Sequence, residues 1–266
     1  MNATYRSTAL TTALAVTLAF GSVGCFGDIF GSDNDVLAEE SFELGVEVTT
    51  QTRLSVVGKN GNIQVTGTSG TDSVLITGVR QVWSDDLEDA EARLEDLDVV
   101  VDEQTGVISV TTVQPADTEG RNYVVEYEIS VPDDLVVAIV DGNGSINVLS
   151  VNSAVSIING NGNIVLDEIV GSVSVELGNG GIDAEMTLPL DGTITLIVGN
   201  GNVDLAIPES TSAMLAVNVG NGGINVLGLD LQDVVTTSRS LTGRLGDGRG
   251  SISLIAGNGN VAAVGF

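Results

Sequence analysis

The chain has 266 residues, of which 34 are glycine and only 3% are aromatic, and its formal net charge is −27. With 36 acidic side chains against nine basic ones, it lacks the basic stripe that phosphate backbones require, so the composition excludes nucleic acid as a partner. Few aromatic residues beside abundant valine, isoleucine and leucine predict a thin aliphatic core, which suits β-strands.

Residues 1–25 have the pattern of an export signal. Arg6 precedes the apolar run ALTTALAVTLAF, which is shorter than a membrane-spanning helix needs. The run ends in GSVGC, which resembles the lipobox of bacterial lipoproteins, although Ser22 stands where leucine is usual. Cys25 is the only cysteine, so no intrachain disulfide can form. We therefore predict that Cys25 is lipidated and that the lipid is the contact of this exported chain with a membrane.

Residues 26–41 are predicted to form an acidic tether, because they are rich in glycine and acidic residues and have no apolar periodicity. Phe26 follows the cysteine where an aspartate would resemble an inner-membrane retention signal. The predicted location is therefore the outer membrane or the cell surface.

Residues 42–135 are predicted to form an N-terminal β region. The segment GKNGNIQVTG, residues 58–67, predicts a first sharp corner with Ile63 and Val65 pointing inward. Alternating apolar residues predict four further strands, at 73–82, 97–101, 106–113 and 123–131.

A single helix is predicted between these strands, at residues 84–96, where it would cap or flank the sheet. Ser84 is the predicted N-cap, and the acidic residues that follow suit the positive end of the helix dipole. One side of the helix is predicted to be apolar and to consist of Leu87, Ala90, Leu94 and Leu97.

Residues 136–266 contain a repeat built on Gly-Asn-Gly triplets. The first glycines of five triplets are separated by 18, 18, 21 and 21 residues, a spacing typical of stacked repeats. Apolar residues alternate with polar ones on both sides of each triplet, as in Val173 and Val175 before Gly178 and Ile182 and Ala184 after it. Each unit is therefore predicted to consist of two short strands joined at a corner.

The last repeat is irregular, because Gly248 and Gly257 are only nine residues apart. We expect the strand that contains Ile252 and Leu254 to serve both corners and to close the stack as a final rung.

The predicted fold is all-β, a β-solenoid with rungs of about 18–21 residues that is continuous with the N-terminal β region as one domain over 42–266. The competing interpretation is an antiparallel meander, since Asn-Gly between alternating strands is also a strong hairpin signal. In a solenoid the corner asparagines would stack as a hydrogen-bonded ladder shielded from bulk water. Its predicted members are Asn143, Asn161, Asn179, Asn200, Asn221 and Asn258.

No catalytic residue, metal site or cofactor is predicted. Without histidine the commonest base and metal ligand are absent, and none of the glycine triplets continues into a phosphate-binding loop. DGNGSINV begins like a calcium loop, but Ile146 and Asn152 replace the turn glycine and the bidentate glutamate. Most of the paired acids fall on the predicted helix, where solvated charge is common.

The order of these segments resembles the bacterial putative-adhesin family, close to the "head GIN" auto-transporter-adhesin domains. The matching pieces are GKNGNIQV, YEISVPDDLVV, DGNGSINV, the later Gly-Asn-Gly corners, VDLAIP, GRLGDGRGSISL and AGNGNV, from residue 42 to the end. The resemblance implies a β-solenoid outside the cytoplasm, with a role in adhesion and no catalytic motif.

The expected function is a non-catalytic scaffold, anchored at the envelope, that binds a surface glycan or another envelope protein. Alternatives are a glycan-active enzyme that uses acidic residues on a β-helix wall and a periplasmic component linked to envelope stress. Aromatic side chains are the usual platforms for glycans, and Trp83 and Tyr123 are the candidates for that role.

Overall fold

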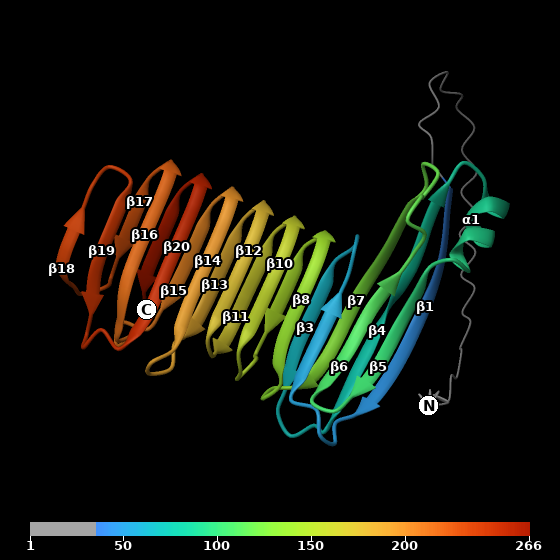
Figure 1. Cartoon of the computed structure of the whole chain (residues 1–266), viewed down its shortest axis with the longest axis horizontal. Coiled ribbons are helices and arrows are strands. Elements are labelled where there is room, and N and C mark those ends of the chain that lie inside the picture. The colour runs from blue at the N-terminus through green and yellow to red at the C-terminus, as the bar shows by residue number, and fades with distance from the viewer. Residues whose placement is uncertain (1–35) are drawn as a thin grey trace, which may run out of the picture.

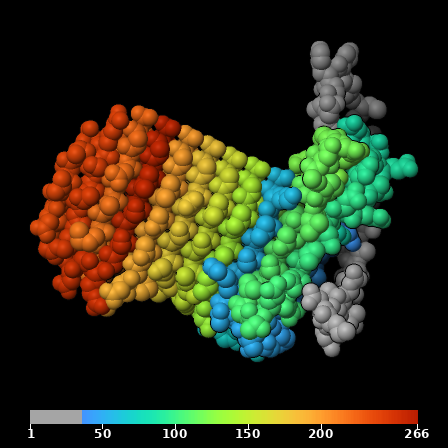
Figure 2. All heavy atoms as spheres, in the orientation of Figure 1, coloured from blue at the N-terminus to red at the C-terminus, as the bar shows by residue number. Residues whose placement is uncertain are grey.

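The computed structural model describes residues 36–266, which form an elongated stack of two facing β-sheets (Figure 1). The predicted signal, Cys25 and residues 26–35 of the predicted tether lie outside the described residues. Space-filling atoms in Figure 2 show the rungs as closely packed bands across the molecule.

The first sheet has ten strands, and the second has eleven. The first sheet contains, in spatial order, β1 (Val36–Glu47), β4 (Ser73–Ser84), β7 (Asn122–Pro132), β3 (Ile63–Thr68), β9 (Ile146–Leu149), β11 (Ile164–Val170), β13 (Ile182–Thr187), β15 (Val203–Ile207), β21 (Val261–Gly265) and β17 (Ile224–Leu227). The second contains β18 (Leu231–Thr236), β19 (Ser240–Leu245), β16 (Ala213–Asn221), β20 (Gly250–Asn258), β14 (Thr193–Asn200), β12 (Val173–Asn179), β10 (Val155–Asn161), β8 (Val136–Asn143), β2 (Arg53–Val57), β6 (Val107–Val113) and β5 (Asp98–Gln104).

Each rung consists of a strand of the second sheet, a corner and a strand of the first sheet. Neighbouring rungs pair in parallel and in register, as Val155 pairs with Val173 and Ile164 with Ile182. The two strands at one corner, such as β10 and β11, belong to different sheets and are not a hairpin. The β-solenoid prediction is therefore confirmed, and the antiparallel meander is wrong for the repeat.

The period-two alternation of the strands builds a continuous aliphatic core between the two sheets. Val155, Ile157, Ile164 and Leu166 are all at most 2% exposed, and the same positions of neighbouring rungs stack on them. Each rung inside the stack buries its inward side chains against two neighbours, so aliphatic residues fill this part of the core. The core also contains Tyr123 and Tyr127, on β7 toward the N-terminal end.

Glycine at the corners is required by the contact between rungs. Gly162 has φ of +133°, and a Cβ there would lie 2.0 Å from the carbonyl oxygen of Gly144. A Cβ on Gly160 would lie 2.4 Å from the carbonyl oxygen of Gly142. No side chain fits at either position. Glycine therefore recurs at the spacing at which the backbones of neighbouring rungs touch.

The rungs do not follow each other in chain order. β20 and β21, the last strands of the chain, lie between the β14–β15 and β16–β17 rungs. β20 runs from the turn before Gly250 to the corner at Gly257, but it lies inside the stack, so the expectation that it closes the stack as a final rung is wrong. Similarly, the β2–β3 rung lies between β6–β7 and β8–β9.

Antiparallel strands cover both ends of the parallel stack. β4 pairs with β7 and β1 with β4 at one end, where β5 also pairs with β6, while β18 and β19 extend the other end. β1 begins at Val36 and pairs with β4 over its whole length, so residues 36–41 form an edge strand and not the end of a tether. Four glutamates in Val36–Glu47 obscure the alternation of apolar and polar residues, so the sequence did not predict this strand.

The helix α1 (Leu87–Leu94) packs on β1 and β4. Its N-cap is Asp86, whose side chain accepts the backbone N–H of Asp89 at 2.8 Å, so the assignment of Ser84 as the cap is wrong. Ser84 is the last residue of β4, and its hydroxyl donates to the Asp89 carboxylate. On the predicted apolar side, Ala90 and Leu97 are buried and Leu94 is half-buried, but Leu87 is 50% exposed.

Candidate functional site

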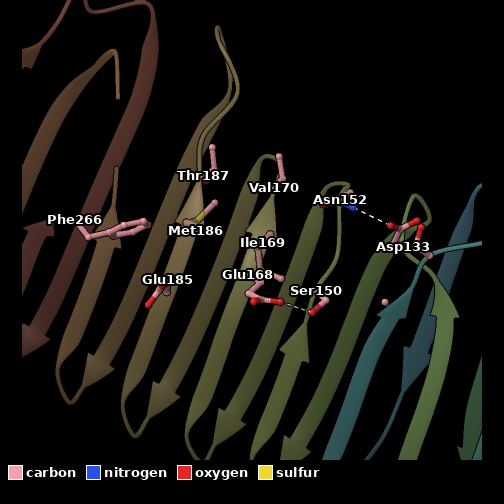
Figure 3. Close-up of a pocket in the computed structure, with 12 residues that line it drawn as sticks. Asp133, Ser150, Asn152, Glu168, Ile169, Val170, Glu185, Met186, Thr187 and Phe266 are labelled. Atoms are coloured by element: carbon pink, nitrogen blue, oxygen red, sulfur yellow. Dashed lines mark hydrogen bonds between the residues drawn. The ribbon is translucent and has the colours of Figure 1, made fainter. Parts of the chain in front are cut away.

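A groove of about 430 Å³ crosses several rungs where the strands of the first sheet end (Figure 3). Its lining residues come from β3, the β7–β8 connection, the β9–β10 connection, β11, β13 and the end of the chain: Gly67, Ser69, Asp133, Ser150, Asn152, Glu168, Ile169, Val170, Glu185, Met186, Thr187 and Phe266. The groove therefore runs along the solenoid axis, across the strands.

Two residues at one repeat position shape this groove. Ser150 and Glu168 are 18 residues apart, and both adopt a left-handed backbone with φ of 54°. Ser150 directly follows β9, whereas Glu168 lies within β11 at the register shift between Leu166 and Ile169, so this conformation bends the chain near the end of each strand. The Ser150 hydroxyl donates to Glu168 Oε2 at 2.7 Å, which fixes the two side chains next to each other.

A second polar pair lies at one end of the groove, and an aromatic ring lies at the other. Asn152 Nδ2 donates to Asp133 Oδ2 at 2.8 Å, and its backbone N–H donates to the Asp133 carbonyl oxygen at 2.6 Å. Phe266, 58% exposed, lies at the opposite end in Figure 3, with Glu185 between the two. The groove therefore offers carboxylate, hydroxyl and amide groups in a row, beside one exposed ring.

The structure brings the predicted corner asparagines together in one column. Each Nδ2 donates to the Oδ1 of the neighbouring asparagine at 2.7–2.8 Å. The spatial order is Asn60, Asn143, Asn161, Asn179, Asn200, Asn258 and Asn221. All of these bonds point toward the N-terminal end of the stack, so their dipoles are aligned.

Two features of the column differ from the expectation. The hydrogen bonds are exposed, so the ladder is not shielded from bulk water. Asn60 is an additional member, which the sequence interpretation missed because Lys59 replaces the first glycine of its triplet. Its Nδ2 donates to the Tyr123 carbonyl oxygen at 3.1 Å.

A second set of asparagines, which follows the triplets, also links the rungs. Their Oδ1 atoms accept a backbone N–H from the next rung at 2.8–2.9 Å. The accepting residues are Asn62, Asn163, Asn202 and Asn260. The repeated asparagine three residues after the first triplet position was the signal for this set.

Two buried polar side chains lie inside the corner, where other rungs carry apolar residues. Asp141 is 5% exposed and Asn159 3%, and they are paired neighbours on β8 and β10. Both carboxylate oxygens of Asp141 and Oδ1 of Asn159 are buried without a hydrogen-bond partner among the described residues. Burial raises the pKa of Asp141 to about 6, although the nearby backbone amides of Gly142 and Asn143 oppose the shift.

The two aromatic candidates differ in exposure. Tyr123 is 2% exposed, with its ring inside the core, so its assignment as a glycan platform is wrong. Burial raises its pKa above the usual value. Trp83 is half-buried on β4, toward the end of the stack that carries α1, and is not part of the groove.

A pair of carboxylates lies next to the groove on the outer face of the first sheet. Asp183 on β13 and Asp204 on β15 are paired in register, and both are exposed. The pKa of Asp204 is raised, first by partial desolvation and then by the charge of Asp183. The two aspartates are 21 residues apart, which is one repeat, and this spacing was the signal in the sequence for the pair.

A larger hollow, of about 810 Å³, lies at the N-terminal end between β1, β4 and β5. Phe42, Leu44, Val79 and Val99 are among the residues that line it. Arg80 in its wall already has two partners. Its guanidinium forms an ion pair with Glu40 and donates a hydrogen bond to the Leu97 carbonyl oxygen.

Residues 36–266 contain no cluster of three or more acidic, cysteine or histidine side chains that could hold a metal ion. Over the same residues, no helix has the length and apolar character that crossing a membrane requires.

The fold and the repeated corners define a β-solenoid of two parallel-rich sheets with antiparallel ends. The Toastrack DUF4097 family model matches residues 20–263, and the chain belongs to this family. Among curated proteins, none matches the chain.

Three solved structures share a distant likeness to the chain. A "putative cell adhesion protein" from Clostridium sporogenes is 12% identical, with 86% of this chain and 100% of that chain covered and a TM-score of 0.49. A "putative adhesin" from Bacteroides fragilis is 10% identical, with 85% and 97% covered and a TM-score of 0.29. A "putative lipid binding protein" from Parabacteroides distasonis is 11% identical, with 85% and 96% covered and a TM-score of 0.29.

Proposed function

We propose that the protein is a non-catalytic, adhesin-like scaffold, anchored at the cell envelope through Cys25, that binds a neutral glycan chain along the groove. The observation that carries this proposal is the direction of the groove. It crosses the rungs and presents side chains from four or more strands and connections in a row, which suits an extended polymer better than a compact ligand. The resemblance to the head GIN domains agrees with an adhesive role.

The chemistry of the lining supports a neutral ligand. Asp133, Glu168 and Glu185 accept hydrogen bonds from sugar hydroxyls, and carboxylate acceptors make stronger hydrogen bonds than neutral groups. The same charges repel acidic polymers, as does the net charge of −27. The exposed ring of Phe266 provides a surface on which a sugar ring can stack.

Binding to immobilised polysaccharides tests this role. The purified full chain is expected to bind a neutral polymer, such as a β-glucan or a mannan, saturably and more tightly than alginate. Glu185→Gln and Phe266→Ala are each expected to weaken binding by about tenfold, since one charged hydrogen bond or one stacked ring contributes about 1–2 kcal/mol. Glu176→Gln, on the outer face of the second sheet, is the matched control and should change nothing. Absence of saturable binding to every polymer would contradict the proposal.

The anchor and the location require a separate test, protease treatment of intact cells with a Cys25→Ala variant beside the native chain. We expect the native protein to be cleaved from outside and the variant to leave the membrane fraction. Cleavage only after permeabilisation would instead support a periplasmic role linked to envelope stress.

A glycan-active enzyme is the second candidate, and the paired Asp183 and Asp204 are the observation in its favour, since two neighbouring carboxylates can provide an acid and a nucleophile or base. Both side chains are exposed on an open strand face, where nothing excludes water from them. Incubation with the bound polysaccharide is expected to release no new reducing ends. Turnover that Asp204→Asn abolishes would establish the enzyme.

A further inference from the structure

The C-terminal end of the solenoid differs from the rest of the molecule in charge. Residues 210–266 contain three acidic and three basic residues, so their net charge is zero and the whole −27 belongs to the residues before them. β17 has no charged side chain, and Asp233 of β18 pairs with Arg244 at 3.0 Å. This end is therefore a neutral surface on a strongly acidic protein.

The same end leaves apolar side chains incompletely covered. Ile224 and Val226 on β17 are half-buried, whereas Val203 and Leu205, at the same repeat positions on β15, are at most 2% exposed. Leu227, Val234 and Val235 are 55%, 48% and 66% exposed. A surface of this kind, neutral and apolar beside acidic surroundings, is typical of an interface.

The opposite end is protected against association. The edge strand β1 carries Glu39, Glu40, Glu43 and Glu47, and the edge strand β5 carries Asp98, Asp102 and Glu103. Charged edge strands prevent strand addition, and α1 packs on β1 and β4 at this end as well. Among the described residues, the C-terminal end has neither a covering helix nor an edge strand with several charged residues.

The two sheets end unevenly there. The second sheet continues beyond β16 with β19 and β18, while the first sheet stops at β17, as the left end of Figure 1 shows. A second copy, rotated about a two-fold axis parallel to the strands, would place its overhanging β18 beside β17 of the first copy. By the same rotation, β18 of the first copy would lie beside β17 of the second.

Strand direction agrees with this arrangement. β17 runs opposite to β16 because a corner joins them, and β18 runs in the direction of β16 because two antiparallel pairings separate them. The rotation keeps strand directions, so β17 and the partner's β18 would be antiparallel. The register shift in β18 between Gln232 and Val235 limits this contact to the segment around Val234–Thr236.

We propose that the protein forms a head-to-head dimer in which β17 of each copy packs beside β18 of the other. Each molecule has both the overhanging strand β18 and the free edge of β17 that receives the partner's β18. The contact is therefore isologous and closed. A second copy is the occupant that the charges favour, because two neutral ends can meet without bringing acidic surfaces together. This inference does not depend on the proposed glycan ligand.

The mass of the full chain, purified in detergent and measured by light scattering, tests the dimer. The native chain is expected to have twice the protein mass of a monomer. Leu227→Lys and Val235→Lys are each expected to raise the dissociation constant by at least about tenfold, because the dimer would bury an unpaired ammonium group. Val100→Lys is the matched control, since Val100 is 43% exposed on β5 at the opposite end.

Circular dichroism and thermal unfolding establish that the variants, all at exposed positions, retain the fold. A native chain that is monomeric at every concentration would overturn the proposal. So would a dimer that tolerates both lysine variants or that Val100→Lys weakens equally.

Discussion

Individual residues at the corners decide whether rungs can stack, and Asp141 is the least expected of them. Its carboxylate occupies an inward position at which later rungs carry Leu177 and Val198. Gly58, on the neighbouring rung, makes room for it, since a Cβ there would lie 2.4 Å from Asp141 Oδ1. A buried carboxylate without a hydrogen-bond partner destabilises the fold when it is ionised.

Replacing Asp141 with asparagine is therefore expected to stabilise the protein at pH 8. The folded-state pKa of about 6 lies above the ordinary value of 3.8, so the folded protein holds this proton more tightly than the unfolded chain does. The stability associated with the proton is present below about pH 4 and is lost as the pH rises through about 6. The gain from Asp141→Asn should reach about 3 kcal/mol at pH 8 and shrink toward zero near pH 4.

Urea unfolding of both proteins at the two pH values measures this difference. Asp89 is a useful contrast, because Arg121 and the Ser84 hydroxyl hold its pKa far below the usual value, and its contribution is lost as the pH falls. An equal effect of Asp141→Asn at pH 4 and pH 8 would show that ionisation is not its cause.

At the scale of the element, the corner column links rungs that the backbone ladder already joins. Each interior asparagine donates one side-chain bond and accepts another, whereas Asn221, the last in the column, donates one to Asn258. Because the bonds are aligned, each polarises the next, as in other hydrogen-bonded chains.

Loss of an interior member should cost more than loss of the last one. Asn161→Ala removes two column bonds and is expected to lower the free energy of unfolding by about 1–2 kcal/mol, since an exposed hydrogen bond contributes about 0.5–1 kcal/mol. Asn221→Ala should cost about half as much. Asn225→Ala, at an exposed position of β17 outside the column, is the control for urea unfolding. Equal costs for all three would mean that the column contributes nothing.

The whole molecule is a long stack in which like charges recur from rung to rung. A net charge of −27 repels itself along such a stack, and the repulsion is weaker in the less regular, more extended unfolded chain. The charge is also unevenly placed, because residues 210–266 are neutral. Repulsion should therefore be strongest toward the N-terminal end.

Salt is expected to stabilise the fold. Raising the ionic strength from about 0.01 M to about 0.1 M shortens the screening length from about 30 Å to about 10 Å. The melting temperature should rise by about 2–4 °C for each kcal/mol of repulsion removed from a chain of this size. Thermal unfolding in salt, with sucrose of equal osmolality as the control, measures the effect. A melting temperature that does not change with salt would contradict it.

Much of the fold could be predicted because the pattern is local and repeated. Alternation identifies the strands at residues 73–84 and 122–132 to within two residues, and the glycine triplets identify the corners. The candidate groove could not be predicted in the same way. Its residues lie at strand ends and in connections of different length between rungs, and Phe266 reaches them only through the stacking of β21 beside β15.

The sequence by itself therefore determined the all-β class and the positions of the corners, because each depends on residues that contact their own repeat or the next. That the rungs pair in parallel and not as hairpins was decided by the tertiary structure, because Asn-Gly between alternating strands suits both arrangements. The tertiary structure decided the spatial order of the rungs, since β21 pairs with both β15 and β17 and no local pattern distinguishes these partners from other strands. It also decided that Tyr123 is buried and Asp141 unpaired, because burial depends on neighbours that lie far away in the chain.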